Sequence, residues 1–400
     1  MRPIYLDNNA TTRTDRGVVA EMLPYFSERF GNASSQHGFG APVAMAVRAA
    51  RQALQNLLGA AAESEIIFTS GGTESDNAAI LSALETQEGR DEIVTTTVEH
   101  PAILALVGHL EKTRGIKVHL IGVDERGRLD IEAYKRALGP HTAVASVMWA
   151  NNETGTIFPI AYLAELAHAA GALFHTDAVQ AVGKMPIDLK ATPIDMLSLS
   201  GHKLHGPKGI GALYVRKGVN FKSLIRGGHQ ERGRRGGTEN VPAIIGLGKA
   251  AALMAENPQE ELSRVRKLRD RLEQGIVEKI GHCIVNGDPD NRLPNTSNIA
   301  FKHLDGEAIL TNMDRGGIAA SSGSACTAGS TVPSHVLKAM RVPASALQGA
   351  VRFSLSRETT GEEIDHVLEI LPQIILKLRS MSPYWTEQLT QADEPAPSLV

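Results

Sequence analysis

The sequence reads SLSGHKLHGPKGIG from Ser198 to Gly211, and this stretch is where we begin to assign the fold. A short apolar strand runs into Ser-Gly-His, which places Lys203 at the carboxyl end of that strand. Open α/β sheets bind their ligands at this edge. A lysine there can form a Schiff base with a carbonyl cofactor, provided that its neighbours lower its pKa. The alternatives are an ordinary surface lysine, or Lys208 in this role, although Pro207 and the glycines after it place Lys208 in a turn.

Strand and helix patterns alternate on both sides of this stretch. Helices are predicted at 44–58, from Thr73 onward with a capping box to Asp76, and at 161–170. Strands are predicted at 65–70, 92–97, 118–121, 143–149, 172–176, 196–200 and 210–215. The alternation predicts an α/β fold with a mainly parallel seven-stranded sheet flanked by helices.

The pattern changes near residue 258, where a long charged helix is predicted at 260–279. Beyond it we expect a smaller α+β unit, with strands at 283–285, 297–301 and 350–354 and helices at 306–314 and 360–379. We therefore expect a large domain at 15–258 and a small domain formed by 1–14 and 259–388, which carries the loop around Cys326. Residues 389–400 have the composition of a flexible tail.

The composition excludes several classes of protein. Among 400 residues, Lys+Arg is 41 and Asp+Glu is 44, so the net charge of 41 − 44 = −3 gives no reason to expect nucleic acid as a partner. Two cysteines cannot form a disulfide framework, and no apolar run is long enough for a membrane helix. We expect a cytoplasmic protein. The nucleotide-binding motifs GxxxxGK[ST] and GxGxxG and the zinc motifs HExxH and CxxC are missing.

Two further strand ends carry candidate cofactor ligands. Asp177 ends the predicted strand LFHTD, where a carboxylate can keep a pyridine nitrogen protonated, although a lone aspartate there is more often a turn residue or a cap. Gln180 follows it closely. The sequence from Ser70 to Thr73, SGGT, offers backbone N–H groups and a hydroxyl to a phosphate at a helix start, which alone is weak support.

Three other side chains allow two interpretations each. His100 follows a strand and could stack on a flat cofactor and relay protons, or be a hydrogen-bonded loop histidine. Arg352 lies inside an apolar strand, so its anionic partner is either a substrate carboxylate or a structural salt bridge. Cys326 lies among small residues in SSGSACTAGS, typical of an exposed mobile loop that carries a reactive thiol, or it is an incidental cysteine. Cys283 is interpreted as a small buried hydrophobic residue.

Together these segments resemble the NifS/IscS-type cysteine desulfurases, a branch of the class V aminotransferase family among the fold-type I pyridoxal-phosphate enzymes. The resemblance runs from Tyr5 to about Arg379. It rests on YLDNNATT, TSGGTESDN, VEHPA, NNETG, HTDAVQ, SGHKLHGPKGIGALYVR, GGHQERGRRGGTEN and SSGSACTAG, in this order. The long cysteine loop is similar to that of the NifS/IscS group, and within it the nitrogen-fixation NifS type is the nearest match.

The resemblance implies pyridoxal 5'-phosphate as cofactor and a role for each residue. Lys203 would bond the cofactor covalently and move the substrate Cα proton, and Asp177 would pair with the pyridine nitrogen. His100 would stack on the ring and assist proton transfer. Gln180 and Asn152 would contact the phenolic oxygen or the substrate.

It also implies how phosphate, substrate and sulfur are held. The phosphate would be bound by Gly72, Thr73, Ser200 and His202. Thr238 would reach the phosphate of the neighbouring subunit, which implies a homodimer. Arg352 would hold the substrate carboxylate, and Cys326 would be the nucleophile.

The activity implied is removal of sulfur from L-cysteine, giving L-alanine and a persulfide on Cys326. The sulfur would pass to an iron–sulfur scaffold protein, for nitrogenase cluster maturation or for general cluster assembly, and only during that transfer would Cys326 contact metal. Two alternatives stay open. One is another pyridoxal-phosphate enzyme, such as a selenocysteine lyase or an aminotransferase, which would not depend on Cys326. The other is a non-catalytic persulfide carrier, which would not need Lys203.

Overall fold

The computed structural model describes residues 3–322, 333–382 and 385. Its largest sheet contains seven strands: β2 (Ile66–Thr69), β3 (Glu92–Thr96), β4 (Lys117–Ile121), β5 (Thr142–Ser146), β6 (Leu173–Asp177), β7 (Met196–Ser200) and β8 (Gly211–Val215). Their order is β2-β8-β7-β6-β5-β3-β4, and β8 alone runs antiparallel to its two neighbours. The predicted mainly parallel seven-stranded sheet is confirmed.

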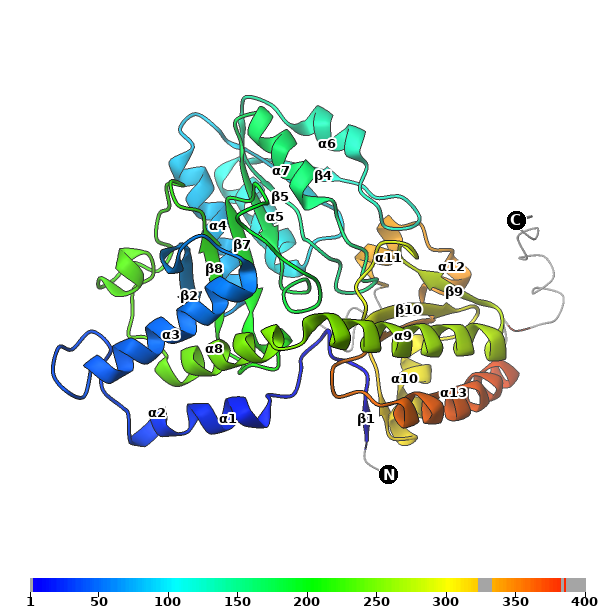
Figure 1. Cartoon of the computed structure of the whole chain (residues 1–400). Helices are drawn as coiled ribbons and strands as arrows, with labels where there is room; N and C mark the ends of the chain where they lie inside the picture. The colour runs from blue at the N-terminus through cyan, green and yellow to red at the C-terminus, as the bar shows by residue number, and fades with distance from the viewer. Residues whose placement is uncertain (1–2, 323–332, 383–384, 386–400) are drawn as a thin grey trace.

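Helices cover this sheet, as Figure 1 shows. They are α1 (Arg16–Met22), α2 (Pro24–Ser27), α3 (Ala41–Leu58), α4 (Gly72–Thr86), α5 (Pro101–Arg114), α6 (Ile131–Ala137), α7 (Ile160–Ala169) and α8 (Val241–Ala255). Strands β5, β7 and β8 are buried along their whole length, as parallel sheets with both faces covered require. Helices α3 and α8 pack so closely that a Cβ at Gly248 would lie 2.5 Å from the Ala50 Cα.

The later part of the chain forms a second, smaller sheet. It is antiparallel, in the order β12-β10-β9, and is built from β9 (Cys283–Asn286), β10 (Thr296–Phe301) and β12 (Ala350–Ser354). The helices of this part are α9 (Pro258–Ile280), α10 (Gly306–Arg315), α11 (His335–Ala339), α12 (Ala344–Leu347) and α13 (Gly361–Met381). Figure 1 shows α9 lying along both parts of the molecule.

The amino-terminal segment belongs with this smaller sheet in space. Strand β1 (Ile4–Tyr5) pairs in parallel with β11 (Ile318–Ala319), and Asp7 bridges to Ser354 at the end of β12. The chain then passes from the smaller sheet to the larger one through Asn8, Asn9 and Ala10. This crossing brings residues at the start of the sequence to the carboxyl edge of the large sheet.

Two local predictions were wrong. The strand predicted at 143–149 ends at Ser146, and the residues after it turn across the sheet edge, where the Trp149 N–H donates to the Asp177 carbonyl at 2.9 Å. The capping box from Thr73 to Asp76 is absent, because α4 begins one residue earlier. The Glu74 carboxylate instead accepts from the Ser70 N–H at 2.8 Å. The predicted tail at 389–400 lies outside the described residues.

Candidate active site

A cavity of about 350 Å³ opens at the carboxyl edge of the large sheet. Strands β2, β3, β5, β6 and β7 all end at this edge, because each of them runs parallel to the others. The residues that follow them therefore converge, as the sequence predicted. The cavity is lined by Asn9, Ala10, Gly72, Thr73, Asp76, His100, Met148, Ala150, Asn152, Asp177, Val179, Gln180, Ser200, His202, Lys203 and Arg352. Every predicted site residue except Thr238 and Cys326 is among them.

Lys203 ends a short 3₁₀-helix, Gly201–Lys203, directly after β7. Its Nζ donates to the backbone carbonyls of Asn9 at 2.5 Å and Ala10 at 2.6 Å, so the amine is held at the cavity wall. Lys208 is exposed, and Gly209 after it has a φ of 77°, as a tight turn requires. The structure thus places the Lys203 amine, and not that of Lys208, at the cavity.

Two buried carboxyl groups lie at the cavity. Asp177 ends β6, and its Oδ1 accepts from the Val179 N–H at 2.9 Å. Burial raises the pKa of Asp177, while His100 and Lys203 oppose that rise. Asp76, on α4, was not predicted from the sequence; burial and then Asp177 raise its pKa well above the usual range. Its Oδ1 has no hydrogen-bond partner among the described residues, so this acidic end of the cavity favours a cationic group.

His100 caps the amino terminus of α5 and is not simply a loop histidine. Its Nδ1 accepts from the Ala102 N–H at 3.1 Å, which leaves the ring proton on Nε2. Burial lowers the pKa of His100, and Lys203 adds to this effect while Asp177 opposes it. The neutral, fixed imidazole suits stacking on a flat ring. The helix itself was missed from the sequence, although Pro101 at its first position is a typical start signal.

The amino terminus of α4 forms an anion-binding end of the cavity. A Cβ at Gly72 would lie 2.8 Å from Val179 Cγ2, so a glycine is favoured where the helix start approaches Val179, two residues after Asp177. The backbone N–H groups of Gly72 and Thr73 and the helix dipole make this end of the cavity suitable for an anion such as phosphate. His202 lines the same cavity, and burial lowers its pKa to about 4, so it serves as a neutral hydrogen-bonding group.

Arg352 combines the two interpretations that the sequence left open. It is buried on β12, where its Nη2 lies 2.7 Å from Asp7 Oδ1 and its Nη1 donates to the Asn152 carbonyl at 3.1 Å. The structural ion pair is therefore present. The guanidinium also lines the cavity, where it can meet an anionic ligand.

The remaining predicted residues lie elsewhere. Thr238 does not line the cavity; its neighbours Gly237 and Glu239 line a separate one of about 130 Å³. Cys326 lies outside the described residues. Cys283 is partly buried against the core of the smaller sheet, and burial raises the pKa of its thiol, as expected for a structural cysteine.

The arrangement fits pyridoxal 5'-phosphate. A lysine amine, a buried acid, a neutral imidazole and a helix amino terminus match the aldehyde, ring nitrogen, ring face and phosphate of that molecule. In the described part of the chain, no cluster of His, Cys, Asp and Glu could hold a metal ion, and no helix is long and apolar enough to cross a membrane.

Comparisons with known proteins agree with this fit. The family model "Aminotransferase class-V" matches residues 4–367. The chain is 68% identical over 385 residues to a cysteine desulfurase of Gluconacetobacter diazotrophicus, and 59% identical over 386 residues to the cysteine desulfurase NifS of Azotobacter vinelandii; each match covers 96% of both proteins. A solved NifS-like protein superposes with a TM-score of 0.88 at 37% identity, over 94% of this chain and 100% of that one. The chain therefore belongs to the class-V aminotransferase family, in its cysteine desulfurase branch.

Proposed function

We propose that this chain removes the sulfur of L-cysteine with pyridoxal 5'-phosphate, releases L-alanine and carries the sulfur as a persulfide on Cys326. The observation that carries the proposal is the convergence of Lys203, Asp177 and His100 on one cavity in a desulfurase fold. The bound cofactor supplies an electron sink for the substrate Cα. All other contributions come from side chains of the protein.

Lys203 is the group that moves protons. Its amine lines the cavity, where it would hold the cofactor and would take the substrate Cα proton and return it. Asp177 keeps the ring nitrogen protonated. Its buried carboxylate is stabilised by a cation at that position, which offsets the cost of burying the charge. The neutral imidazole of His100 would stack on the cofactor ring and pass protons through Nε2.

The other cavity residues position the two ligands. Gly72, Thr73, Ser200 and His202 hold the phosphate. Arg352, whose guanidinium lines the cavity, would bind the substrate carboxylate. Asn152 and Gln180 contact the phenolic oxygen or the substrate.

Cys326 completes the reaction as a thiolate nucleophile. Its sulfur attacks the substrate sulfur, an S–S bond forms and the substrate C–S bond breaks. The substrate Cβ gains one hydrogen, so alanine plus the persulfide balances cysteine plus the thiol without an external oxidant. We assign the persulfide sulfur to an iron–sulfur scaffold protein in nitrogenase cluster maturation, and place the reaction in the cytoplasm, where thiols stay reduced.

The direct test measures alanine release from L-cysteine in the presence of a reducing thiol. The wild type should release alanine catalytically. Lys203→Ala should lose the cofactor's visible absorbance and at least about 10³-fold of the rate, whereas Lys208→Ala, on the exposed turn, should keep both. Pyruvate as the sole product, or an active Lys203→Ala protein, would contradict the proposal.

A further inference from the structure

A second lysine stands behind the cavity wall. Lys184, four residues after Gln180, donates from Nζ to Gln180 Oε1 at 2.6 Å and to Asn9 Oδ1 at 3.1 Å. The Gln180 Nε2 in turn donates to the Asn9 carbonyl at 3.0 Å. Three residues thus form a closed ring of hydrogen bonds in which Lys184 provides two of the three donations. Because the Gln180 Oε1 accepts from Lys184 and its Nε2 donates to Asn9, the Gln180 side-chain amide has only one orientation.

Asn9 connects this ring to the Lys203 amine. The carbonyl that accepts from Gln180 also accepts from Lys203 Nζ at 2.5 Å. The Asn9 side chain bonds the smaller sheet, with Nδ2 donating to Thr296 Oγ1 at 2.8 Å and Oδ1 accepting from Asn295 Nδ2 at 3.0 Å. Removing Lys184 would therefore loosen both the amide of Gln180 and the acceptor that holds Lys203.

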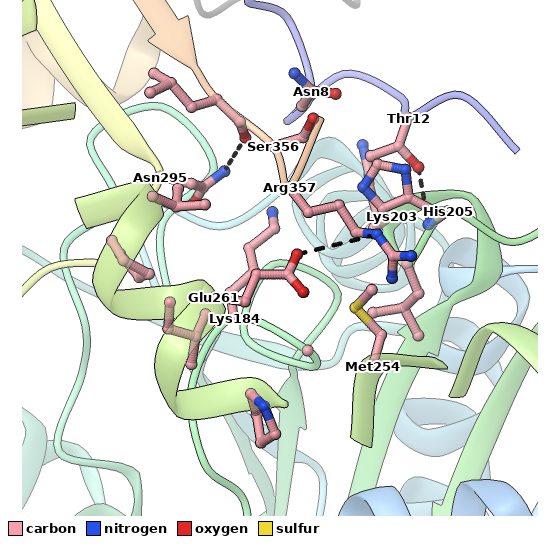
Figure 2. Close-up of a pocket in the computed structure, with 17 residues that line it drawn as sticks. Asn8, Thr12, Lys184, Lys203, His205, Met254, Glu261, Asn295, Ser356 and Arg357 are labelled. Atoms are coloured by element: carbon pink, nitrogen blue, oxygen red, sulfur yellow. Dashed lines mark hydrogen bonds and ion pairs between the residues drawn. The ribbon is translucent and has the colours of Figure 1, made fainter. Parts of the chain in front are cut away.

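Lys184 makes no ion pair with any residue that the structure describes. Among the described residues its recorded partners are amide oxygens, and its charged neighbours Lys203 and Arg352 are cations. Lys184 and Lys203 both line a second cavity of about 50 Å³. Figure 2 shows that Glu261, at the same cavity, is joined to Arg357. His205, also at this cavity, is uncharged because burial lowers its pKa. Burial, then Lys203 and Arg352, hold the pKa of Lys184 well below its usual range.

We propose that Lys184 is a positioning residue of the active site, which fixes the Gln180 amide and the Asn9 carbonyl against Lys203. This rests on the proposed pyridoxal-phosphate chemistry. The Asn9 carbonyl accepts from Lys203 Nζ, so a fixed Asn9 carbonyl fixes the position of that nitrogen at the cavity wall.

The test uses the cofactor-loaded protein without substrate. The visible absorbance of the bound cofactor is titrated with pH in the wild type, Lys184→Met, Lys184→Arg and, as matched control, Lys190→Met on the exposed loop that follows. Loss of the two Lys184 donors in Lys184→Met should loosen the Asn9 carbonyl, which then stabilises the protonated nitrogen less, so the titration midpoint should fall by about one pH unit. Lys184→Arg, which keeps hydrogen-bond donors at this position, should stay near the wild-type midpoint, and so should Lys190→Met.

Kinetics with L-cysteine provides the second readout. Alanine release by Lys184→Met should fall about tenfold in kcat, with partial recovery in Lys184→Arg. A midpoint and a kcat for Lys184→Met equal to those of Lys190→Met would overturn the proposal. So would equal loss of cofactor and of thermal stability in both Lys184 variants, because the role would then be structural only. If the wild type releases no alanine, the proposed function fails, while the substrate-free titration still tests Lys184.

Discussion

Several ionisable side chains of this site are buried and only partly paired with opposite charges. Asp76, Glu99, Asp177 and His175 are almost fully buried within or just behind the cavity wall. His175 bridges Ser146 Oγ at 2.8 Å and Ser198 Oγ at 2.9 Å, and burial lowers its pKa to about 3, so it is a neutral link under Asp177. Such burial costs stability, and enzymes accept this cost where a charge must be available to a ligand.

The stability cost of burying an ionisable group can be measured at Glu99. Its Oε1 accepts from Thr96 Oγ1 at 2.8 Å and from the Met148 N–H at 3.0 Å, while Oε2 has no hydrogen-bond partner among the described residues. Burial raises the pKa of Glu99 from 4.5 to about 8. Between these values the folded state keeps a proton that the unfolded state lacks, so the free energy of unfolding falls as pH rises from 4.5 to 8.

Glu99→Gln should remove this pH dependence. The stability advantage of the variant over the wild type should grow by about 2–3 kcal/mol between pH 5.5 and 7.5. Urea unfolding at both pH values measures it, with Glu88→Gln as the exposed control. Parallel pH curves for the wild type and Glu99→Gln would show that Glu99 is ionised throughout.

Among the secondary-structure elements, α3 fixes the loop that carries Thr238. Arg51 on α3 forms a bidentate ion pair with Glu231, at 2.6 and 2.7 Å. Glu231 also accepts from the N–H of Phe68 in β2. Both side chains are buried. The pair therefore holds residues 226–240 beside the strand that leads to the phosphate end of the cavity.

Arg51→Met should cost about 3–5 kcal/mol of unfolding free energy, because it leaves the buried Glu231 carboxylate without its positively charged partner. The matched control is Arg48→Met, one turn earlier, where the pair with Glu63 is exposed and the loss should stay below about 1 kcal/mol. Equal losses in the two variants, measured by urea unfolding, would mean that the buried pair does not hold the loop.

The elements also show what could be predicted from the sequence. Strand ends and their polar residues follow from local patterns, so Lys203, Asp177 and His100 could be named before the structure. Asn9, Asp76 and Lys184 could not be assigned roles, because these depend on contacts between distant segments; the Asn9 N–H, for example, meets Ser354 Oγ at 2.9 Å. Helix and strand propensities give no information about contacts between residues that lie far apart in the sequence. The strand at 143–149 was drawn too long because the buried turn after Ser146 is as apolar as a strand.

The whole molecule has an amino-terminal segment that crosses between its two sheets, and an exposed apolar surface near that end. Five large apolar side chains in this stretch are each at least 60% exposed: Leu23, Phe26, Phe30, Phe39 and Met45. A surface that contacts only solvent rarely exposes so many large apolar side chains together. Together with the position of Thr238 outside its own chain's cavity, this supports the proposed homodimer.

Sedimentation equilibrium should give about twice the chain mass of 42.8 kDa. Thr238→Ala should weaken cofactor retention without dissociating the dimer, because the hydroxyl would contact the phosphate across the interface and contribute about 1–2 kcal/mol. A monomer that holds the cofactor as tightly as any dimer would contradict this assembly.

The most direct test of the whole account is mass spectrometry of the protein after L-cysteine turnover without reductant, with alanine measured in parallel. The wild type and Cys283→Ala, in which only the partly buried structural cysteine is lost, should gain one sulfur atom on Cys326 and release a matching amount of alanine. Cys326→Ala should keep the cofactor absorbance, gain no sulfur and release almost no alanine. Full alanine release by Cys326→Ala, or sulfur found on Cys283, would contradict the account.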